Sequence, residues 1–385
     1  MAAIAVRDRM DQTKIDVPPG LANVVVAETE LGDVRGIEGF YHYRDHSATT
    51  LARTRSVEDV WRLMIDGRLP EDAERAAFAA EVRASRALPA ALEPLLEPIS
   101  RSTRTADALA GLRAVIPVLA GVRGFRPLYD EDEPGRRSDA LSLGAAVPSV
   151  LAALHRVGTG RRPVAPRADL DHAANYLWML SGREPDDRVR AAIEAYLVST
   201  IDHGFNASTF TARVVASTGG DLGAVVTAAL GSLSGPLHGG APSRALQLLD
   251  LGSAAAASAY VRQQVAIGGR VMGFGHAVYR TEDPRSALMK EVALGFGGPR
   301  VDLAIEIEAA VLRTLEEVKP GRALRTNVEF YAALVMEACG IPPEMFTATF
   351  AVARVLGWTA HALEQARTGK IIRPASRYVG PEPTV

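Results

Sequence analysis

The chain has 385 residues, of which 48% are hydrophobic and 23% are charged, so a disordered chain and a fibrous repeat are excluded. Its 43 Lys and Arg residues nearly balance 45 Asp and Glu residues, giving a formal net charge of −2, which excludes the basic footprint of a general nucleic-acid-binding protein. The single cysteine, Cys339, excludes intrachain disulfides and every metal or redox motif that needs several cysteines.

The first ten residues do not resemble a targeting segment. Their apolar stretch is shorter than the ~7–15 residues of a secretory core, and charged residues follow it. We find no stretch of the roughly 18 apolar residues needed to cross a bilayer. The expected location is therefore the cytoplasm, without a membrane partner.

The predicted elements are short strands followed by many helices. Residues 24–44 alternate in polarity and contain three glycines, which predicts short strands joined by turns. From Ser56 onward, apolar residues recur at spacings of three and four, and the first such run ends at Gly67. Further helices are predicted at 71–87, 105–119, 138–156, 168–180, 187–201, 221–233, 254–266, 301–318, 328–339 and 343–367. Loops are predicted at 130–135, 158–163, 231–240, 268–284 and 295–299.

Three histidines beside glycines are the strongest candidates for chemistry. His203 precedes a glycine, His238 precedes two, and His276 follows one. Adjacent glycines expose the backbone and let a ligand approach closely. One such histidine would more often be a packing residue, but three in the same setting favour a functional site. They are too far apart in sequence for a zinc motif, so we expect acid–base or electrophilic work at a carbonyl and no metal.

Arginines form a second set of candidates. Arg354 lies inside an apolar helical run, where its charge is costly unless it meets a carboxylate. That carboxylate belongs either to an internal Asp or Glu or to a dicarboxylate substrate gripped by the guanidinium. Arg285 and Arg373, each beside a proline, belong to the same set.

Glu329 stands among apolar neighbours at the start of a predicted helix. Burial there would raise its pKa toward that of a useful general base. The alternative is a first-turn carboxylate that only interacts with the helix dipole.

Five ordered motifs resemble the citrate synthase family. They are Asp202-His-Gly-Phe-Asn-Ala-Ser-Thr-Phe, Gly-Pro-Leu-His238-Gly-Gly, Gly-Phe-Gly-His276-Ala-Val-Tyr-Arg-x-x-Asp-Pro-Arg285, Asn327-Val-Glu-Phe-Tyr, and Arg354 followed by Arg373-Pro. The likeness extends from about residue 20 to Pro381. It implies a mainly α, two-domain helical fold with a short N-terminal β element. The large domain would comprise 1–237 and 342–385, and an inserted small domain, 238–341, would close over the active site. The resemblance also implies a homodimer.

The resemblance also implies an acyltransferase reaction. Acetyl-CoA condenses with oxaloacetate, and the thioester is hydrolysed to citrate and CoA at the entry to the tricarboxylic acid cycle. The CoA thioester is a substrate, and neither a metal nor a permanently bound cofactor is implied.

The resemblance assigns roles to individual residues. The implied catalytic residues are His238, His276 and Glu329. The implied oxaloacetate and citrate ligands are His203, Arg285, Arg354 and Arg373, the last reaching across from the partner subunit. The implied CoA ligands are Val271, Met272, Gly273, Phe274 and Gly275 for the adenine, and Lys319, Arg322 and Arg325 for the phosphates.

The main departure from the family is the base, because Glu329 stands where the family usually has Asp. The reference pKa values of the two side chains differ by only about 0.4, so basicity is retained. The extra methylene matters more, since a displacement of roughly 1 Å can cost on the order of 100-fold in rate. We expect a pocket built for Glu. The alternatives are a 2-methylcitrate synthase that uses propionyl-CoA and a low-activity or regulatory protein of the same fold.

Overall fold

The structure is a computed structural model that describes residues 14–103, 107–239, 242–276, 278–322 and 324–381. It confirms the mainly α fold with one small sheet near the N-terminus. The helices are α2 (Ala48–Thr54), α3 (Val57–Asp66), α4 (Asp72–Ala84), α5 (Glu93–Ser102), α6 (Ala108–Arg123), α7 (Glu133–Gly158), α8 (His172–Ser181), α9 (Asp187–Thr200), α10 (Ala207–Ser217), α11 (Leu222–Leu233), α12 (Pro242–Asp250), α13 (Ala254–Ala266), α14 (Pro284–Phe296), α15 (Pro299–Val318), α16 (Val328–Ala338) and α17 (Phe346–Thr368). Short 3-10 turns are η1 (Pro19–Leu21), η2 (Ala90–Leu92) and η4 (Pro343–Met345).

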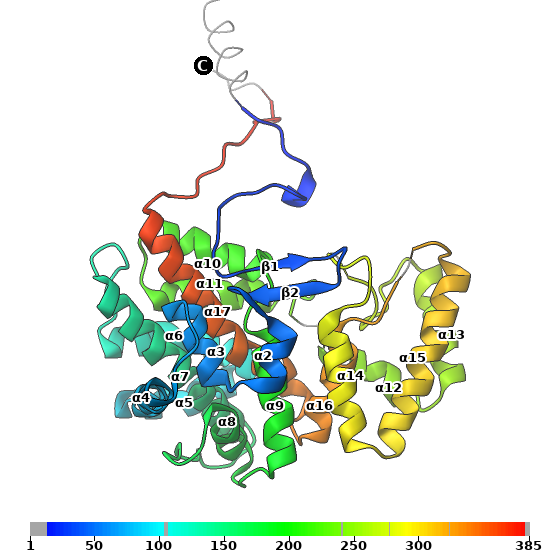
Figure 1. The fold of residues 1–385 in the computed structure, drawn as a ribbon, viewed down its shortest axis with the longest axis horizontal. Coiled ribbons are helices and arrows are strands. Elements are labelled where there is room, and N and C mark those ends of the chain that lie inside the picture. The colour runs from blue at the N-terminus through cyan, green and yellow to red at the C-terminus, as the bar shows by residue number, and fades with distance from the viewer. Residues whose placement is uncertain (1–13, 104–106, 240–241, 277, 323, 382–385) are drawn as a thin grey trace, which may run out of the picture.

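Helix α17 is the centre of the larger group of helices. It packs against α3, α7, α10 and α11, and Figure 1 shows it running between them. Nearly all of its residues from Phe346 to Leu363 are buried, many of them Ala, Gly or Thr. Small side chains on every face let several helices approach closely, so α17 is covered from all sides. Arg354 is thereby placed deep inside the protein.

Helix α7 is long and apolar enough to cross a membrane by length and composition alone, contrary to our expectation that no segment is. In the fold, however, 83% of its most apolar window is buried against other helices. We therefore assign it to the core.

The sheet is a three-stranded antiparallel meander. Strands β1 (Gly32–Arg35), β2 (Phe40–Tyr43) and β3 (His46–Ser47) pair in that order. Two buried tyrosines hold it to the end of α9, because the Tyr41 hydroxyl donates to the Ser199 carbonyl and the Tyr43 hydroxyl to the Val198 carbonyl, each at 2.9 Å. At the other side, the Arg280 N–H donates to the Gly36 carbonyl at 3.0 Å. The β1–β2 hairpin thus connects α9 with the loop that contains His276.

Some predicted boundaries are wrong. Residues 24–31 are not a strand, the predicted loop at 130–135 already contains the start of α7, and the predicted loop at 231–240 contains the end of α11. Asp132 caps α7, and proline is accepted in a first turn because its missing N–H would have no helical partner there. Helices α2, α5, α10, α12 and α14 lie outside the predicted runs.

Gly357 marks the closest approach of α17 to the residues that precede His203. A Cβ at this position would lie 2.2 Å from the Ile201 carbonyl oxygen. We expect Gly357→Ala to lower the free energy of unfolding by about 3 kcal/mol, because packed backbone cannot move away from the methyl group. Urea unfolding would measure the change. Gly231→Ala in α11 is the matched control, because its Cβ would meet open space and should stabilise the helix by about 0.5–1 kcal/mol. Equal stabilities of the two variants would contradict the prediction.

Candidate active site

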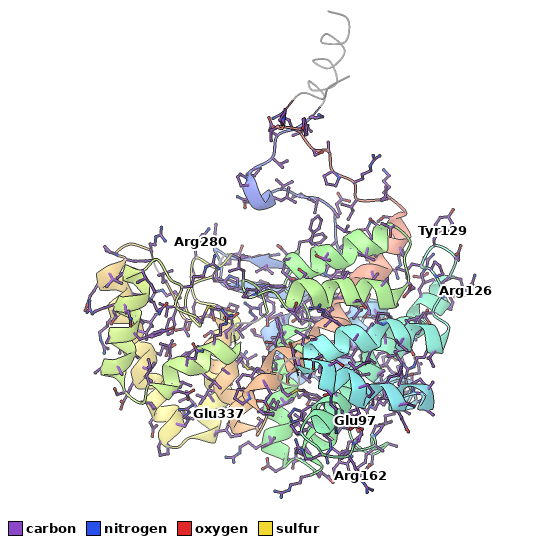
Figure 2. All side chains as sticks on the ribbon, turned by 180° about the vertical axis from the view of Figure 1, so that it is seen from behind. Glu97, Arg126, Tyr129, Arg162, Arg280 and Glu337 are labelled. Atoms are coloured by element: carbon purple, nitrogen blue, oxygen red, sulfur yellow. The ribbon has the colours of Figure 1, made fainter. Side chains whose placement is uncertain are left out.

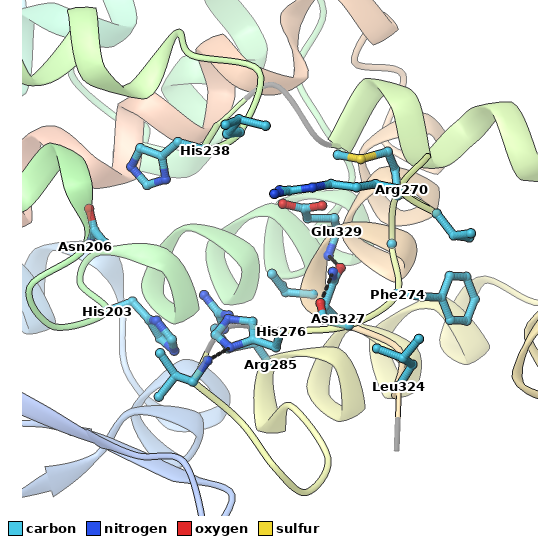
Figure 3. A pocket seen from close by; sticks show the side chains of 18 of the residues that line it. His203, Asn206, His238, Arg270, Phe274, His276, Arg285, Leu324, Asn327 and Glu329 are labelled. Carbon is cyan, nitrogen blue, oxygen red and sulfur yellow. Dashed lines mark hydrogen bonds between the residues drawn. The ribbon is translucent and has the colours of Figure 1, made fainter. Parts of the chain in front are cut away.

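A cavity of about 960 Å³ brings most of the candidate residues together. Segments from the α9–α10 loop, the 271–276 loop, α14, the start of α16 and the middle of α17 line it. Figure 3 shows the histidine rings and the Glu329 carboxylate around one open space. The candidates that line it are His203, His238, Val271, Met272, Gly273, Phe274, Gly275, His276, Arg285, Lys319, Arg322, Glu329 and Arg354.

His203 follows α9 and is buried. Its Nε2 lies 2.9 Å from the hydroxyl of Tyr279. The preceding residue, Asp202, is fixed by His361, whose Nε2 lies 3.2 Å from the Asp202 carboxylate. Burial and the charges of Arg285 and Arg354 hold the pKa of His203 well below its usual range, so its imidazole is neutral at pH 7.

His276 has its tautomer set by the backbone. The N–H groups of Val278 and Tyr279 donate to its Nδ1 at 3.0 and 3.1 Å, so this nitrogen carries no proton. Burial, with a contribution from Arg285, lowers the pKa of His276 to about 4, and the neutral ring therefore has its proton on Nε2. Arg285 Nη2 lies 3.1 Å from that Nε2. Two donors side by side need a common acceptor, which a ligand oxygen would supply.

His238 is held by the first turn of α10. Its Nε2 lies 2.8 Å from the Ser208 hydroxyl, and that hydroxyl also lies 2.8 Å from the Asn206 side-chain oxygen. Asn206 is the N-cap of α10, and its side-chain oxygen accepts the backbone N–H of Ser208. The cap therefore holds Ser208 in place beside His238. Burial lowers the pKa of His238 to about 4, so its ring is neutral as well.

Glu329 lies in the first turn of α16, where its backbone N–H donates to the Asn327 side chain at 3.1 Å. Asn327 also donates through its side chain to the Gly275 carbonyl at 2.9 Å, and thereby connects this turn to the 271–275 loop. Burial raises the pKa of Glu329 to about 7, and the nearby Asp283 charge contributes, although Arg285 opposes the shift. A carboxylate with this pKa is suited to general base catalysis near neutral pH.

Asp283 links the arginine to the helix that contains Glu329. Its carboxylate accepts hydrogen bonds from Arg285 Nε at 3.0 Å and Nη2 at 2.9 Å, and also from the Val328 N–H at 3.1 Å. Arg285 and the start of α16 therefore share one buried anchor.

Arg354 is the buried arginine whose partner the sequence left open. Only 3% of it is exposed, and its Nε and Nη1 have no hydrogen-bond partner within the described part of the chain. Its guanidinium lies over the Phe350 ring at 4.8 Å. Because it makes no ion pair with any described carboxylate, an internal partner is not what fixes this side chain.

Exposed cations lie around the 271–276 loop, and none of them pairs with a carboxylate of the described residues. An adjoining cavity of about 310 Å³ shares His276 and Arg322 with the main one and adds Arg280 and Arg325. Arg270 lines the main cavity and extends into it (Figure 3), and Arg280 lies at the surface near the small sheet (Figure 2). Neither Arg270 nor Arg280 was predicted as a site residue, although basic residues at both ends of a glycine-rich loop are a usable signal.

Arg373 is the one candidate outside both cavities. It is exposed and lies on the C-terminal segment 369–381, which leaves the body of the protein (Figure 1). Among the described residues, no group of three or more His, Cys, Asp or Glu side chains is arranged to hold a metal ion.

Comparison with known proteins gives the family. The sequence model of the citrate synthase C-terminal domain matches residues 20–375. The chain belongs to the citrate synthase family. Its members are enzymes, which confirms the predicted family and enzyme class.

Individual relatives extend this result. A Mycobacterium tuberculosis protein named "Putative citrate synthase 2" is 39% identical, over 95% of this chain and 93% of that protein. The 2-methylcitrate synthase of the same species is 34% identical, over 96% of this chain and 92% of that protein. Among solved structures, a ternary complex of Thermoplasma acidophilum citrate synthase with carboxymethyl coenzyme A and oxaloacetate superposes with a TM-score of 0.89 at 26% identity, covering 96% and 98% of the two chains.

Proposed function

We propose that this member of the family is a citrate synthase that condenses acetyl-CoA with oxaloacetate and hydrolyses the resulting thioester to citrate and CoA. The observation that carries the proposal is Glu329, a carboxylate with a pKa of about 7 that faces the same cavity as neutral His238 and His276. A weakly acidic carbon next to a thioester needs a base of this kind and donors aimed at the enolate oxygen.

The first half of the reaction uses Glu329 and His238. Glu329 accepts a proton from the methyl group of acetyl-CoA, while His238 donates a hydrogen bond to the thioester oxygen. The single hydroxyl proton of Ser208 is donated to the Asn206 side-chain oxygen at 2.8 Å in this structure, and it must turn to His238 Nε2 to place the imidazole proton on Nδ1. A neutral donor is appropriate because it stabilises the enolate without protonating it in advance.

The second half uses the paired donors at His276. His276 Nε2 and Arg285 Nη2 lie 3.1 Å apart at the cavity, and an oxygen of oxaloacetate placed between them would accept hydrogen bonds from both. His276 polarises the ketone and gives its proton to the alkoxide that forms. Arg354, with two unpartnered nitrogen atoms, binds a carboxylate of the same substrate.

The remaining assignments follow from the surroundings of the cavity. The 271–275 loop would hold the CoA adenine. The CoA phosphates would be held by nearby cations that form no ion pair within the described part of the chain, namely Arg270, Arg280, Lys319, Arg322 and Arg325. Arg373 is too exposed to serve its own cavity, which supports a homodimer in which the partner subunit receives it. Helices α12–α15 lie together at one end of the molecule (Figure 1), which supports a small domain at 238–341 that closes over the substrates.

The nearest alternative is the propionyl-CoA reaction that gives 2-methylcitrate, and the 34% identity to a 2-methylcitrate synthase favours it as a second candidate. The acyl groups differ by one methylene, worth only ~1–3 kcal/mol of discrimination. Parallel thiol-release assays with oxaloacetate and each acyl-CoA would decide between them. A higher kcat/KM for acetyl-CoA supports the proposal, and a higher value for propionyl-CoA would replace it with the alternative.

The pH dependence of kcat/KM should reflect Glu329 alone between pH 5 and 8. The base acts in its deprotonated form, so kcat/KM should rise tenfold per pH unit below about 7 and level off above it. His238 and His276, with pKa values of about 4, stay neutral over this range, so they cause no further rise or fall of kcat/KM with pH. A profile measured under saturating oxaloacetate would test this, and a flat profile from pH 5 to 7 would contradict it.

A further inference from the structure

Tyr279 has no role in the reaction described above, yet it lies between two of the active-site histidines. Its ring centroid is 4.8 Å from that of His276 and 5.4 Å from that of His203. Only 5% of the side chain is exposed, and the Arg285 guanidinium lies 5.9 Å from its ring centroid. The side chain lines the smaller cavity and not the larger one, so it does not face the proposed substrates directly.

The hydroxyl of Tyr279 has a single acceptor available. Its only hydrogen-bond partner among the described residues is His203 Nε2, at 2.9 Å. A buried hydroxyl proton requires an acceptor, because leaving it unsatisfied costs the desolvation of the group. The proton therefore points at His203 Nε2, and burial raises the pKa of Tyr279 so that the proton stays on the phenol.

This hydrogen bond decides where His203 carries its own proton. A neutral imidazole has one protonated nitrogen, and Nε2 is the acceptor. The proton must be on Nδ1, for which the described residues supply no acceptor. An N–H group that faces a cavity without a protein partner is available to a carboxylate or carbonyl of a ligand.

We propose that Tyr279 is a positioning residue that holds the proton of His203 on Nδ1, so that His203 donates to oxaloacetate. The proposal rests on the proposed function for the identity of the ligand, whereas the tautomer itself depends only on the geometry of the two side chains. Tyr279 belongs to the loop that contains His276, and His203 belongs to the α9–α10 loop. One hydrogen bond therefore connects the loop that contains His276 to the loop that contains His203.

The tautomer can be measured without any activity. Protein labelled with 15N-histidine would be examined by long-range 1H–15N correlation, with the His203 signals identified by their loss in His203→Asn. We expect Nδ1 to be protonated in the wild-type protein and the proton to shift toward Nε2 in Tyr279→Phe, which keeps the ring and removes only the hydroxyl. A wild-type His203 protonated on Nε2 would overturn the proposal.

Kinetics test the consequence for binding. Tyr279→Phe should raise KM for oxaloacetate about tenfold, the effect of one weakened hydrogen bond to a charged group, and leave KM for acetyl-CoA within a factor of two. Tyr176→Phe is the matched control, since it removes a buried hydroxyl bonded to Thr349 away from both cavities and should leave both KM values unchanged. In the His203→Asn background, Tyr279→Phe should add no further loss. An unchanged KM for oxaloacetate in Tyr279→Phe would overturn the proposal, whereas absence of condensation by the wild-type protein with either acyl-CoA would refute the proposed function and leave the tautomer measurement intact.

Discussion

Glu329→Gln should lower kcat by about a thousandfold while leaving the fold intact. The amide has nearly the same shape as the carboxylate but cannot accept a proton, and a positioned general base contributes typically 10²–10⁴-fold. The backbone contact of Glu329 with the Asn327 cap does not involve the altered atoms, so α16 should begin at the same residue. Thiol release under saturating substrates would measure kcat, and thermal unfolding would verify the fold.

Glu337→Gln is the control for this experiment. Glu337 lies on the same helix and pairs with Arg300, outside both cavities, so its loss should leave kcat unchanged. Glu329→Asp tests whether the pocket is built for the longer side chain. Withdrawing the carboxylate by roughly 1 Å should lower kcat on the order of 100-fold. A gain in turnover would instead identify Glu329 as an impaired base, and full activity of Glu329→Gln would show that another group removes the proton.

The sequence singled out residues that line the cavity, but it did not predict how they are arranged there. Each histidine could be singled out by its neighbouring glycines, and Glu329 by its place at a helix start, because those signals are local in the chain. The position of Tyr279 against His203 could not be predicted, because the two residues belong to different loops that only the packed helices bring together. The link from Asp283 to the Val328 N–H is of the same kind.

Three helices were missed for a related physical reason. Helices α10, α12 and α14 each follow a loop rich in glycine or in capping residues. Because of these loop residues, no helix was predicted in the segments that follow them. For α14 the start signal was in fact present, since Asp283 caps it and Pro284 occupies its first turn. For α17 the periodicity was clear. Its burial on all faces, however, depends on neighbours remote in sequence, and so does the lack of a carboxylate beside Arg354 among the described residues.

Arg354→Met should weaken oxaloacetate binding at least 100-fold and still not destabilise the free protein. The guanidinium is the buried cation best placed to meet a substrate carboxylate, and losing a desolvated charge pair costs 2–5 kcal/mol of binding. In the free protein the same charge is destabilising, because two of its nitrogens have no partner among the described residues and each unsatisfied group costs about 1–3 kcal/mol. The cation–π contact with the Phe350 ring stabilises the buried guanidinium by only about 1–2 kcal/mol. Thermal unfolding with and without oxaloacetate would measure both effects.

Arg213→Met provides the contrast, because Arg213 is equally buried but fully partnered. It bonds Gln365 at 2.9 Å and forms an ion pair with Glu364, both on α17. Removing it leaves a carboxylate without its partner, and breaking a buried pair costs 3–5 kcal/mol, so this variant should unfold at a clearly lower temperature than the wild type. Added oxaloacetate should raise the unfolding temperature of the wild type and of Arg213→Met but not that of Arg354→Met, since only a ligand that binds the native state stabilises it. If Arg354→Met were destabilised as much as Arg213→Met and still responded to oxaloacetate, Arg354 would be a structural residue and the cavity would bind its substrate by other groups.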